Sequence, residues 1–134
     1  MKKQAEEWLK YAQVDLLAAR QMIVNQELTS VVSFHAQQCI EKVFKAVLEY
    51  YDMKIPRVHD LRKLYKEIER NNNIIYVNYE IIDQLNQVYI DSRYPADHGL
   101  LPYGIPSQEK AREFMFEAEK IYNHVKEYIE HEVE

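Results

Sequence analysis

The sequence predicts an all-α fold, an up-and-down bundle of four long helices and one short helix. Apolar residues recur at spacings of three and four along most of the chain, the period of an amphipathic helix. Two glycines and four prolines in 134 residues favour long regular elements over a turn-rich β fold. No segment shows the strict alternation of a half-buried strand. A chain of 134 residues is expected to form one domain, residues 1–134.

The first two predicted helices cover about residues 4–25 and 29–51. The apolar face of the first consists of Trp8, Tyr11, Ala12, Leu16, Ala19, Met22 and Ile23. Thr29 or Ser30 can cap the second helix. That helix is apolar over most of its circumference, so we expect it to lie centrally and to contact several neighbours. Its one polar stripe consists of His35, Gln38, Lys42, Lys45 and Glu49, and Glu41 is expected to form a small surface pairing with Lys45.

A short third helix is predicted to follow Asp60, whose carboxylate suits an N-cap, and to end near residue 70. The fourth helix is expected over about residues 75–92, with an inward face of Val77, Ile81, Leu85 and Val88. Pro95 disfavours helical geometry at the residue before it, so this helix should stop near Arg93.

The last predicted helix begins behind Ser107, which suits an N-cap. Its apolar stripe is the usual core face of a bundle helix and consists of Ala111, Phe114, Ala118, Ile121, Val125 and Tyr128, with Met115, Tyr122 and Ile129 alongside. The acidic tail, residues 130–134, is expected to fray.

The one long irregular connection, residues 93–106, holds both glycines and three of the four prolines. Loops of this length in a compact domain are usually functional or disordered. Arg93 can form a bidentate contact with a phosphate, and His98 can accept or donate a proton near neutral pH. Together they could cleave RNA without a metal, with His98 as base and Arg93 stabilising the phosphate charge, while Tyr94 and Tyr103 stack a base or hydrogen-bond a phosphate. On spacing alone, the simpler interpretation is that Arg93 bonds the last carbonyls of its helix.

Other candidate residues have a simpler structural explanation. His124, Glu127 and His131 share a helical face at a spacing that can bind metal, but a solvated face is favoured, and we predict no metal site and no cofactor. Cys39 is interpreted as a small buried side chain. His59 and Asp60 could form an acid–base pair, although the capping role of Asp60 is favoured. His35 could line a groove or a dimer seam, and an ordinary exposed histidine explains it equally well.

Composition limits which binding partners and which cellular compartment are expected for the protein. A net charge of −5 argues against a general phosphate-binding surface, so any nucleic-acid contact has to be local. A single cysteine excludes a disulfide framework and suits a reducing compartment. No apolar run approaches the length that crosses a bilayer, and because Glu6 and Glu7 follow the basic start without an apolar region, we expect no signal peptide. We therefore expect a cytoplasmic protein with no membrane contact.

Three stretches of the sequence resemble HEPN domains, in the right order and over nearly the whole chain. They are residues 33–46 (SFHAQQCIEKVFKA), 58–64 (VHDLRKL) and 89–95 (YIDSRYP). The resemblance is strongest to the small stand-alone bacterial and archaeal members, which often occur beside a minimal nucleotidyltransferase as a pair with toxin–antitoxin character. It implies a bundle of four or five helices and a homodimer.

In the HEPN members that are ribonucleases, an arginine followed after four to six residues by a histidine cleaves RNA without metal. Arg93 and His98 match that spacing. The sequence departs from those members at Tyr94–Pro95, where a polar residue is common, and at Leu100, where toxins tend to have tyrosine. The resemblance thus implies first a nucleotide- or partner-binding subunit, paired with a minimal nucleotidyltransferase, with Arg93, Tyr94 and His98 at its cleft. The alternative is a metal-independent ribonuclease, and a weaker third is a helical bundle whose loop only covers a dimer seam.

Overall fold

The computed structural model describes residues 2–71, 75–93 and 105–133, with the side chains of residues 3–71, 75–88 and 105–131. Its elements are α1 (Lys2–Met22), a 3₁₀ turn (Gln26–Leu28), α2 (Thr29–Tyr50), α3 (Leu61–Asn71), α4 (Tyr79–Arg93) and α6 (Gln108–Val133). These ranges contain no strand. The predicted all-α fold class is confirmed.

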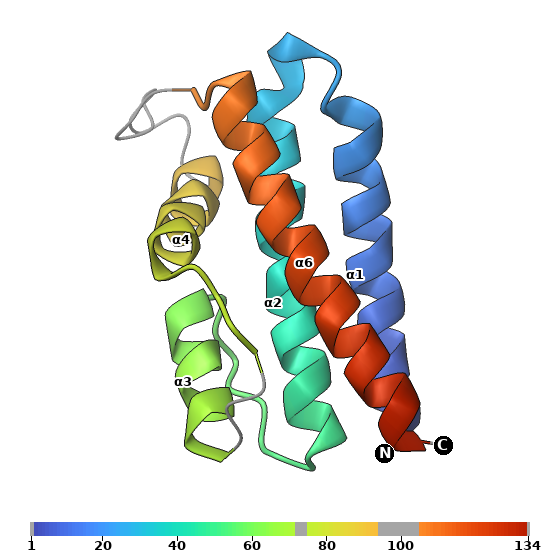
Figure 1. Cartoon of the computed structure of the whole chain (residues 1–134). Helices are drawn as coiled ribbons and strands as arrows, with labels where there is room; N and C mark the ends of the chain where they lie inside the picture. Colours follow the sequence, from blue (N-terminus) through green and yellow to red (C-terminus); the bar gives the residue numbers. More distant parts are fainter. Residues whose placement is uncertain (1, 72–74, 94–104, 134) are drawn as a thin grey trace.

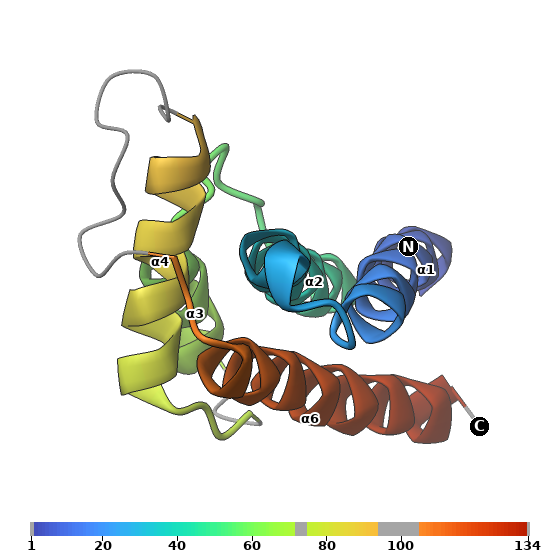
Figure 2. The same ribbon diagram turned by 90° about the horizontal axis from the view of Figure 1, so that it is seen from above.

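The three longest helices, α1, α2 and α6, run side by side, and α3 and α4 flank them on one side (Figure 1). The central position predicted for the second helix is confirmed, since α2 packs against α1, α6, α4 and α3. From above, α1 and α2 are seen nearly end-on while α4 is seen from its side, so α4 crosses α2 at a large angle (Figure 2). No described helix covers the side of α2 that faces away from α6 (Figure 2).

The core lies around α2 and includes side chains from each of the described α-helices. Its largest fully buried apolar side chains are Leu16, Ile40, Phe44, Leu48, Leu61, Leu64, Ile68, Ile75, Ile82, Leu85 and Ile121. Most of the predicted α6 stripe is buried, and Tyr128 is half-buried. One predicted core residue is wrong: Tyr11 is 58% exposed, because the buried stripe of α1 is narrower than its apolar stripe. Among the described residues, no helix has the length and apolar character needed to cross a membrane.

Two predicted helix caps are confirmed and one is wrong. Asp60 Oδ1 accepts hydrogen bonds from the backbone N–H groups of Arg62 and Lys63 at 2.9 and 3.2 Å. Ser107 Oγ accepts from Lys110 N at 3.0 Å. At α2 the N-cap is Leu28, without a side-chain cap, because the preceding 3₁₀ turn shifts the helix start. The buried Thr29 hydroxyl has no hydrogen-bond partner among the described residues.

The predicted start of the fourth helix is also wrong, since residues 75–78 are not helical and α4 begins at Tyr79. Ile75 is 1% exposed, Tyr76 is 84% exposed and Val77 is partly buried, which is the alternation of an extended segment. Asn78 Oδ1 then caps α4 by accepting from Ile81 N at 3.2 Å. At the other end of the chain α6 continues to Val133, so the tail expected to fray is helical up to that residue.

Candidate functional site

The predicted site residues fall on two parts of the chain. Arg93 is the last residue of α4, and its side chain lies outside the described residues, as do Tyr94, His98 and Tyr103. The described part of the chain therefore leaves the pairing of Arg93 with His98 a prediction. His35 lies on α2, half-buried, on the side of that helix that faces away from the core.

His35 is held by a buried carboxylate from α1. Asp15 is 6% exposed; its Oδ1 lies 2.8 Å from His35 Nδ1, and its Oδ2 accepts a hydrogen bond from Lys42 Nζ at 2.6 Å. A carboxylate bonded to Nδ1 fixes the orientation of the imidazole and leaves Nε2 to face outward. His35 Nε2 has no partner within the described ranges. Asp15, His35 and Lys42 thus form a cluster on the surface that α1 and α2 share, called here the α1–α2 face. This cluster can present a hydrogen-bonding histidine to a ligand.

The sequence interpretation missed Asp15. It lies between Ala12 and Ala19 on the apolar side of the first helix, where an acidic residue is unusual. A carboxylate on an apolar face generally requires a partner. The position of Asp15 on an apolar face was the signal in the sequence that it needs a partner. Its two partners, His35 and Lys42, lie 20 and 27 residues away in the sequence.

A second buried carboxylate, Glu41, ties α2 to the segment before α3. Its Oε2 lies 2.9 Å from Lys45 Nζ and 3.0 Å from His59 Nδ1, and its Oε1 accepts from Gln37 Nε2 at 3.2 Å. Glu41 is 4% exposed, so the small surface pairing predicted with Lys45 is instead a buried ion pair. Gln37 Nε2 also reaches the backbone carbonyl of His59 at 3.5 Å. This arrangement fixes where the chain enters α3.

Asn86 extends these polar contacts to α4. Its amide Nδ2 donates to Asp60 Oδ1 at 3.0 Å, and its Oδ1 accepts from Leu61 N at 2.8 Å, so it binds the N-terminus of α3 twice. His59 contacts Glu41 while Asp60 caps α3, so the favoured capping interpretation of Asp60 is confirmed. Arg93 follows Asn86 by seven residues, about two helical turns, so the two backbone positions share one side of α4. The Asn86 contacts therefore fix the orientation of the helix that ends at Arg93.

The two lysines in the polar stripe of α2 are neutralised by buried carboxylates. Lys42 pairs with Asp15 and Lys45 pairs with Glu41, and each carboxylate is also bonded to a histidine. Lys45 Nζ additionally lies 5.3 Å from the centre of the Trp8 ring, within cation–π range. The α1–α2 face carries directional polar groups with little unbalanced positive charge.

The remaining candidate residues lie along α6 and, for Cys39, in the buried part of α2. No group of three metal-ligating side chains occurs in the described ranges. His131 Nε2 lies 3.6 Å from Glu127 Oε1, and both side chains are at least 70% exposed, as expected for a solvated face. Cys39 is fully buried, and burial, followed by the negative charge of Asp15, raises the pKa of its thiol, which disfavours the reactive thiolate. The interpretation of Cys39 as a small buried side chain is confirmed.

Comparison with known proteins agrees with this architecture. The family model of the HEPN domain matches residues 5–128. A crystal structure of ST0689, an archaeal HEPN homologue, is similar with a TM-score of 0.68 and 28% identity, covering 94% of this chain and 98% of that chain. The crystal structure of TT1696 from Thermus thermophilus is similar with a TM-score of 0.73 and 22% identity, over 92% and 97% of the two chains. No curated protein matches.

The fold and the α1–α2 face thus define a small all-helical domain with a polar face on its central helix. The match over residues 5–128 places the chain in the HEPN domain family. The resemblance inferred from the sequence is confirmed.

Proposed function

We propose that this HEPN protein is a nucleotide- or partner-binding helical subunit that works with a minimal nucleotidyltransferase, in a pair of toxin–antitoxin character. The observation that supports this most is the neutralisation of Lys42 and Lys45 by Asp15 and Glu41. Affinity for an RNA backbone comes mainly from unpaired cations that displace counterions. A face of neutralised lysines is better suited to directional contacts with a nucleotide or a protein, and the net charge of −5 supports the same conclusion.

In this proposal, the nucleotide or partner would contact the end of α4 and the outer face of α2. Arg93 would bind a phosphate or carboxylate, His98 would support it, and Tyr94 and Tyr103 would stack a base. His35 contributes Nε2, because Asp15 occupies Nδ1 at 2.8 Å. Asn86 supports the assignment by holding α4, the helix that ends at Arg93, against α3.

We also propose a homodimer through the α1–α2 face. No described helix covers this side of α2 (Figure 2). Apolar side chains remain exposed on it or beside it, with Tyr11 at 58%, Val14 at 63% and Val31 at 36%. Trp8 and Tyr11 line a hollow of about 180 Å³ on the same face. Exposed apolar groups grouped in this way are typical of an interaction surface. Sedimentation of the purified protein should show a dimer that Val31→Glu weakens.

Calorimetry with ATP and AMP tests the binding function. Arg93→Ala should weaken binding by about tenfold or more, the usual effect of losing a charge-assisted hydrogen bond. Arg112→Ala is the matched control, because Arg112 is an exposed arginine on α6. A parallel co-expression with a minimal nucleotidyltransferase should yield a complex that survives purification. Absence of both nucleotide binding and complex formation would contradict the proposal.

The alternative function is a metal-independent ribonuclease. It is favoured by one observation, that α4 extends to Arg93, so the arginine that opens the Arg93–His98 motif stands at the end of a helix fixed by Asn86. His98 would take the 2′-hydroxyl proton, and the 2′-oxygen would attack phosphorus. The 5′-oxygen would then leave, taking a proton from water, to give a 2′,3′-cyclic phosphate and a 5′-hydroxyl. Arg93 would stabilise the charge on the phosphate.

The two functions are separated by incubating single-stranded RNA with the purified protein in excess chelator. Cyclic-phosphate products that disappear in both Arg93→Ala and His98→Ala would establish the ribonuclease. Equal cleavage in wild type and both variants would indicate a contaminant, and intact RNA would exclude the activity for the isolated protein.

A further inference from the structure

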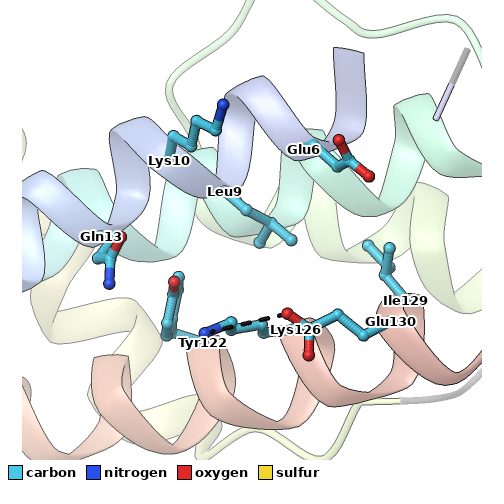
Figure 3. Close-up of a pocket in the computed structure, with 8 residues that line it drawn as sticks. All are labelled: Glu6, Leu9, Lys10, Gln13, Tyr122, Lys126, Ile129 and Glu130. Carbon is cyan, nitrogen blue, oxygen red and sulfur yellow. Dashed lines mark ion pairs between the residues drawn. The ribbon is translucent and has the colours of Figure 1, made fainter. Parts of the chain in front are cut away.

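A groove of about 450 Å³ lies between the first half of α1 and the last half of α6. Figure 3 shows Leu9 and Ile129 facing it from the two helices, with the polar side chains of Gln13 and Lys126 at one end and Glu6 at the other. Leu9 and Ile129 are 7% and 2% exposed, so they form an apolar floor. The volume is within the range of small-molecule sites. The groove lies apart from the end of α4 and from the outer face of α2.

Tyr122 provides a hydroxyl donor that opens onto this groove. Only 6% of the residue is exposed, but its hydroxyl is not among the buried polar atoms that lack a partner, so it opens onto the groove. Figure 3 shows the hydroxyl on the side toward α1, facing Gln13. Burial, with smaller contributions from Cys39 and Glu130, raises the pKa of Tyr122, so the phenol keeps its proton. An acceptor on a ligand in the groove can take the hydrogen bond that this hydroxyl otherwise makes to water.

Positive charge is available beside Tyr122. Lys126 Nζ lies 4.0 Å from Glu130 Oε1, the outer limit of an ion pair, and the two side chains are 44% and 65% exposed. Such a pair is weak and can be replaced by a better acceptor. Figure 3 shows the Lys126 ammonium group next to Tyr122. Tyr122, Gln13 and Lys126 thus gather three donors at one end of the groove.

An ion pair bounds the groove beyond this donor end. Arg20 Nε on α1 donates to Glu119 Oε2 on α6 at 2.9 Å and so joins the two helices. Arg20 follows Gln13 by two helical turns. From Glu6 to Gln13 the helix rises about 10 Å, which is comparable to an extended eight-carbon chain. The groove is therefore long enough for a short hydrocarbon ligand with its polar group at the donor end.

We propose that this groove binds a small amphipathic monocarboxylate. The carboxylate accepts hydrogen bonds from Tyr122 Oη, the Gln13 amide and Lys126 Nζ. The hydrocarbon body covers Leu9 and Ile129 and ends near Glu6, whose charge disfavours a second anionic group there. The site is independent of the nucleotide cleft and of the dimer face proposed above.

Titration of isotope-labelled protein with sodium octanoate, followed by NMR, tests the proposal. We expect saturable shifts at Leu9, Gln13 and Lys126, with a Kd on the order of 1 mM for a ligand of this size. Octanol and octylamine are matched ligands without the negative charge and should bind about tenfold more weakly. Binding of octylamine as tight as that of octanoate would overturn the assignment of an anion, and absence of saturable octanoate binding would overturn the site.

Two conservative variants locate the carboxylate. Tyr122→Phe removes only the hydroxyl and should weaken octanoate binding about tenfold, and Lys126→Gln should weaken it by a similar factor. Tyr76→Phe, at a tyrosine before α4 that is 84% exposed, is the matched control and should bind as wild type does. Thermal melting confirms that each variant is folded. Unchanged binding in both Tyr122→Phe and Lys126→Gln, or an equal loss in Tyr76→Phe, would contradict the proposal.

Discussion

The two buried carboxylates of the α2 region, Asp15 and Glu41, have similar partners and different roles. Each lies beside one histidine Nδ1, at 2.8 and 3.0 Å, and each accepts from one lysine, at 2.6 and 2.9 Å. Glu41 additionally accepts from Gln37 at 3.2 Å and lies next to the Asp60–Asn86 contacts that dock α3 and α4. Asp15 joins only α1 and α2, which already pack closely.

This difference separates a structural cluster from a candidate binding cluster. Removing Glu41 would release the segment that positions α3 and, through Asn86, the orientation of α4. Removing Asp15 would leave the helix packing in place and free His35 to rotate. The same chemical grouping thus contributes to fold stability in one place and, in our proposal, to the presentation of His35 to a ligand in the other.

The largest effect is expected for Glu41→Ala. Lys45, whose side chain is 12% exposed, would keep its charge in a nearly buried position without a partner. Breaking a buried ion pair from one side typically costs about 3 kcal/mol or more, and we expect a loss of about 3 kcal/mol in the free energy of unfolding. Urea denaturation measures it. Glu127→Ala, at an acidic side chain that is 75% exposed, is the control and should change stability by less than about 0.5 kcal/mol.

Asn86→Ala should have the next largest effect, about 2 kcal/mol. The variant loses two hydrogen bonds and leaves the N–H of the fully buried Leu61 without its acceptor. Hydrogen exchange should accelerate in α3 and α4 and stay unchanged in α1. The control is Asn123→Ala, an exposed asparagine on α6. Uniform acceleration across all helices would show that Asn86 acts on the whole core and not on the docking of α3 and α4.

For Asp15→Asn we expect a smaller loss, about 1 kcal/mol. The histidine and lysine partners have side chains that are 26% and 25% exposed, so water can solvate them when the charge is removed. Urea denaturation beside Glu41→Gln gives a matched pair of carboxylate-to-amide changes. A loss in Asp15→Asn equal to that in Glu41→Gln would break the distinction between the two clusters.

Most of the fold could be predicted from the sequence because helix periodicity is a local signal. The stripes of α2 and α6 and the caps at Asp60 and Ser107 depend on residues within a few positions of one another. The start of α4 was missed because Val77 lies four residues before Ile81 and so fits the helical stripe of Val77, Ile81, Leu85 and Val88. The alternating exposure of Ile75, Tyr76 and Val77 is instead that of an extended segment.

The polar clusters could not be predicted in the same way because their partners are distant in the sequence. Asp15 meets Lys42 across 27 residues, and Asn86 meets Asp60 across 26. A charged residue on an apolar face signals a required partner, but the identity of that partner follows only from helix packing. The Arg93–His98 pairing rests on local spacing and family resemblance, and it stays a prediction.

His35→Gln should have the smallest effect on stability and a clear effect on binding. The amide of glutamine can still donate to Asp15, so the free energy of unfolding should change by less than about 0.5 kcal/mol. The outward imidazole Nε2 of His35 is lost, so calorimetry should show AMP binding several-fold weaker. His124→Gln, at an exposed histidine on α6, should leave binding unchanged. A large loss of stability with unchanged AMP affinity would make the Asp15 cluster structural, as the Glu41 cluster is, and would remove His35 from the proposed cleft.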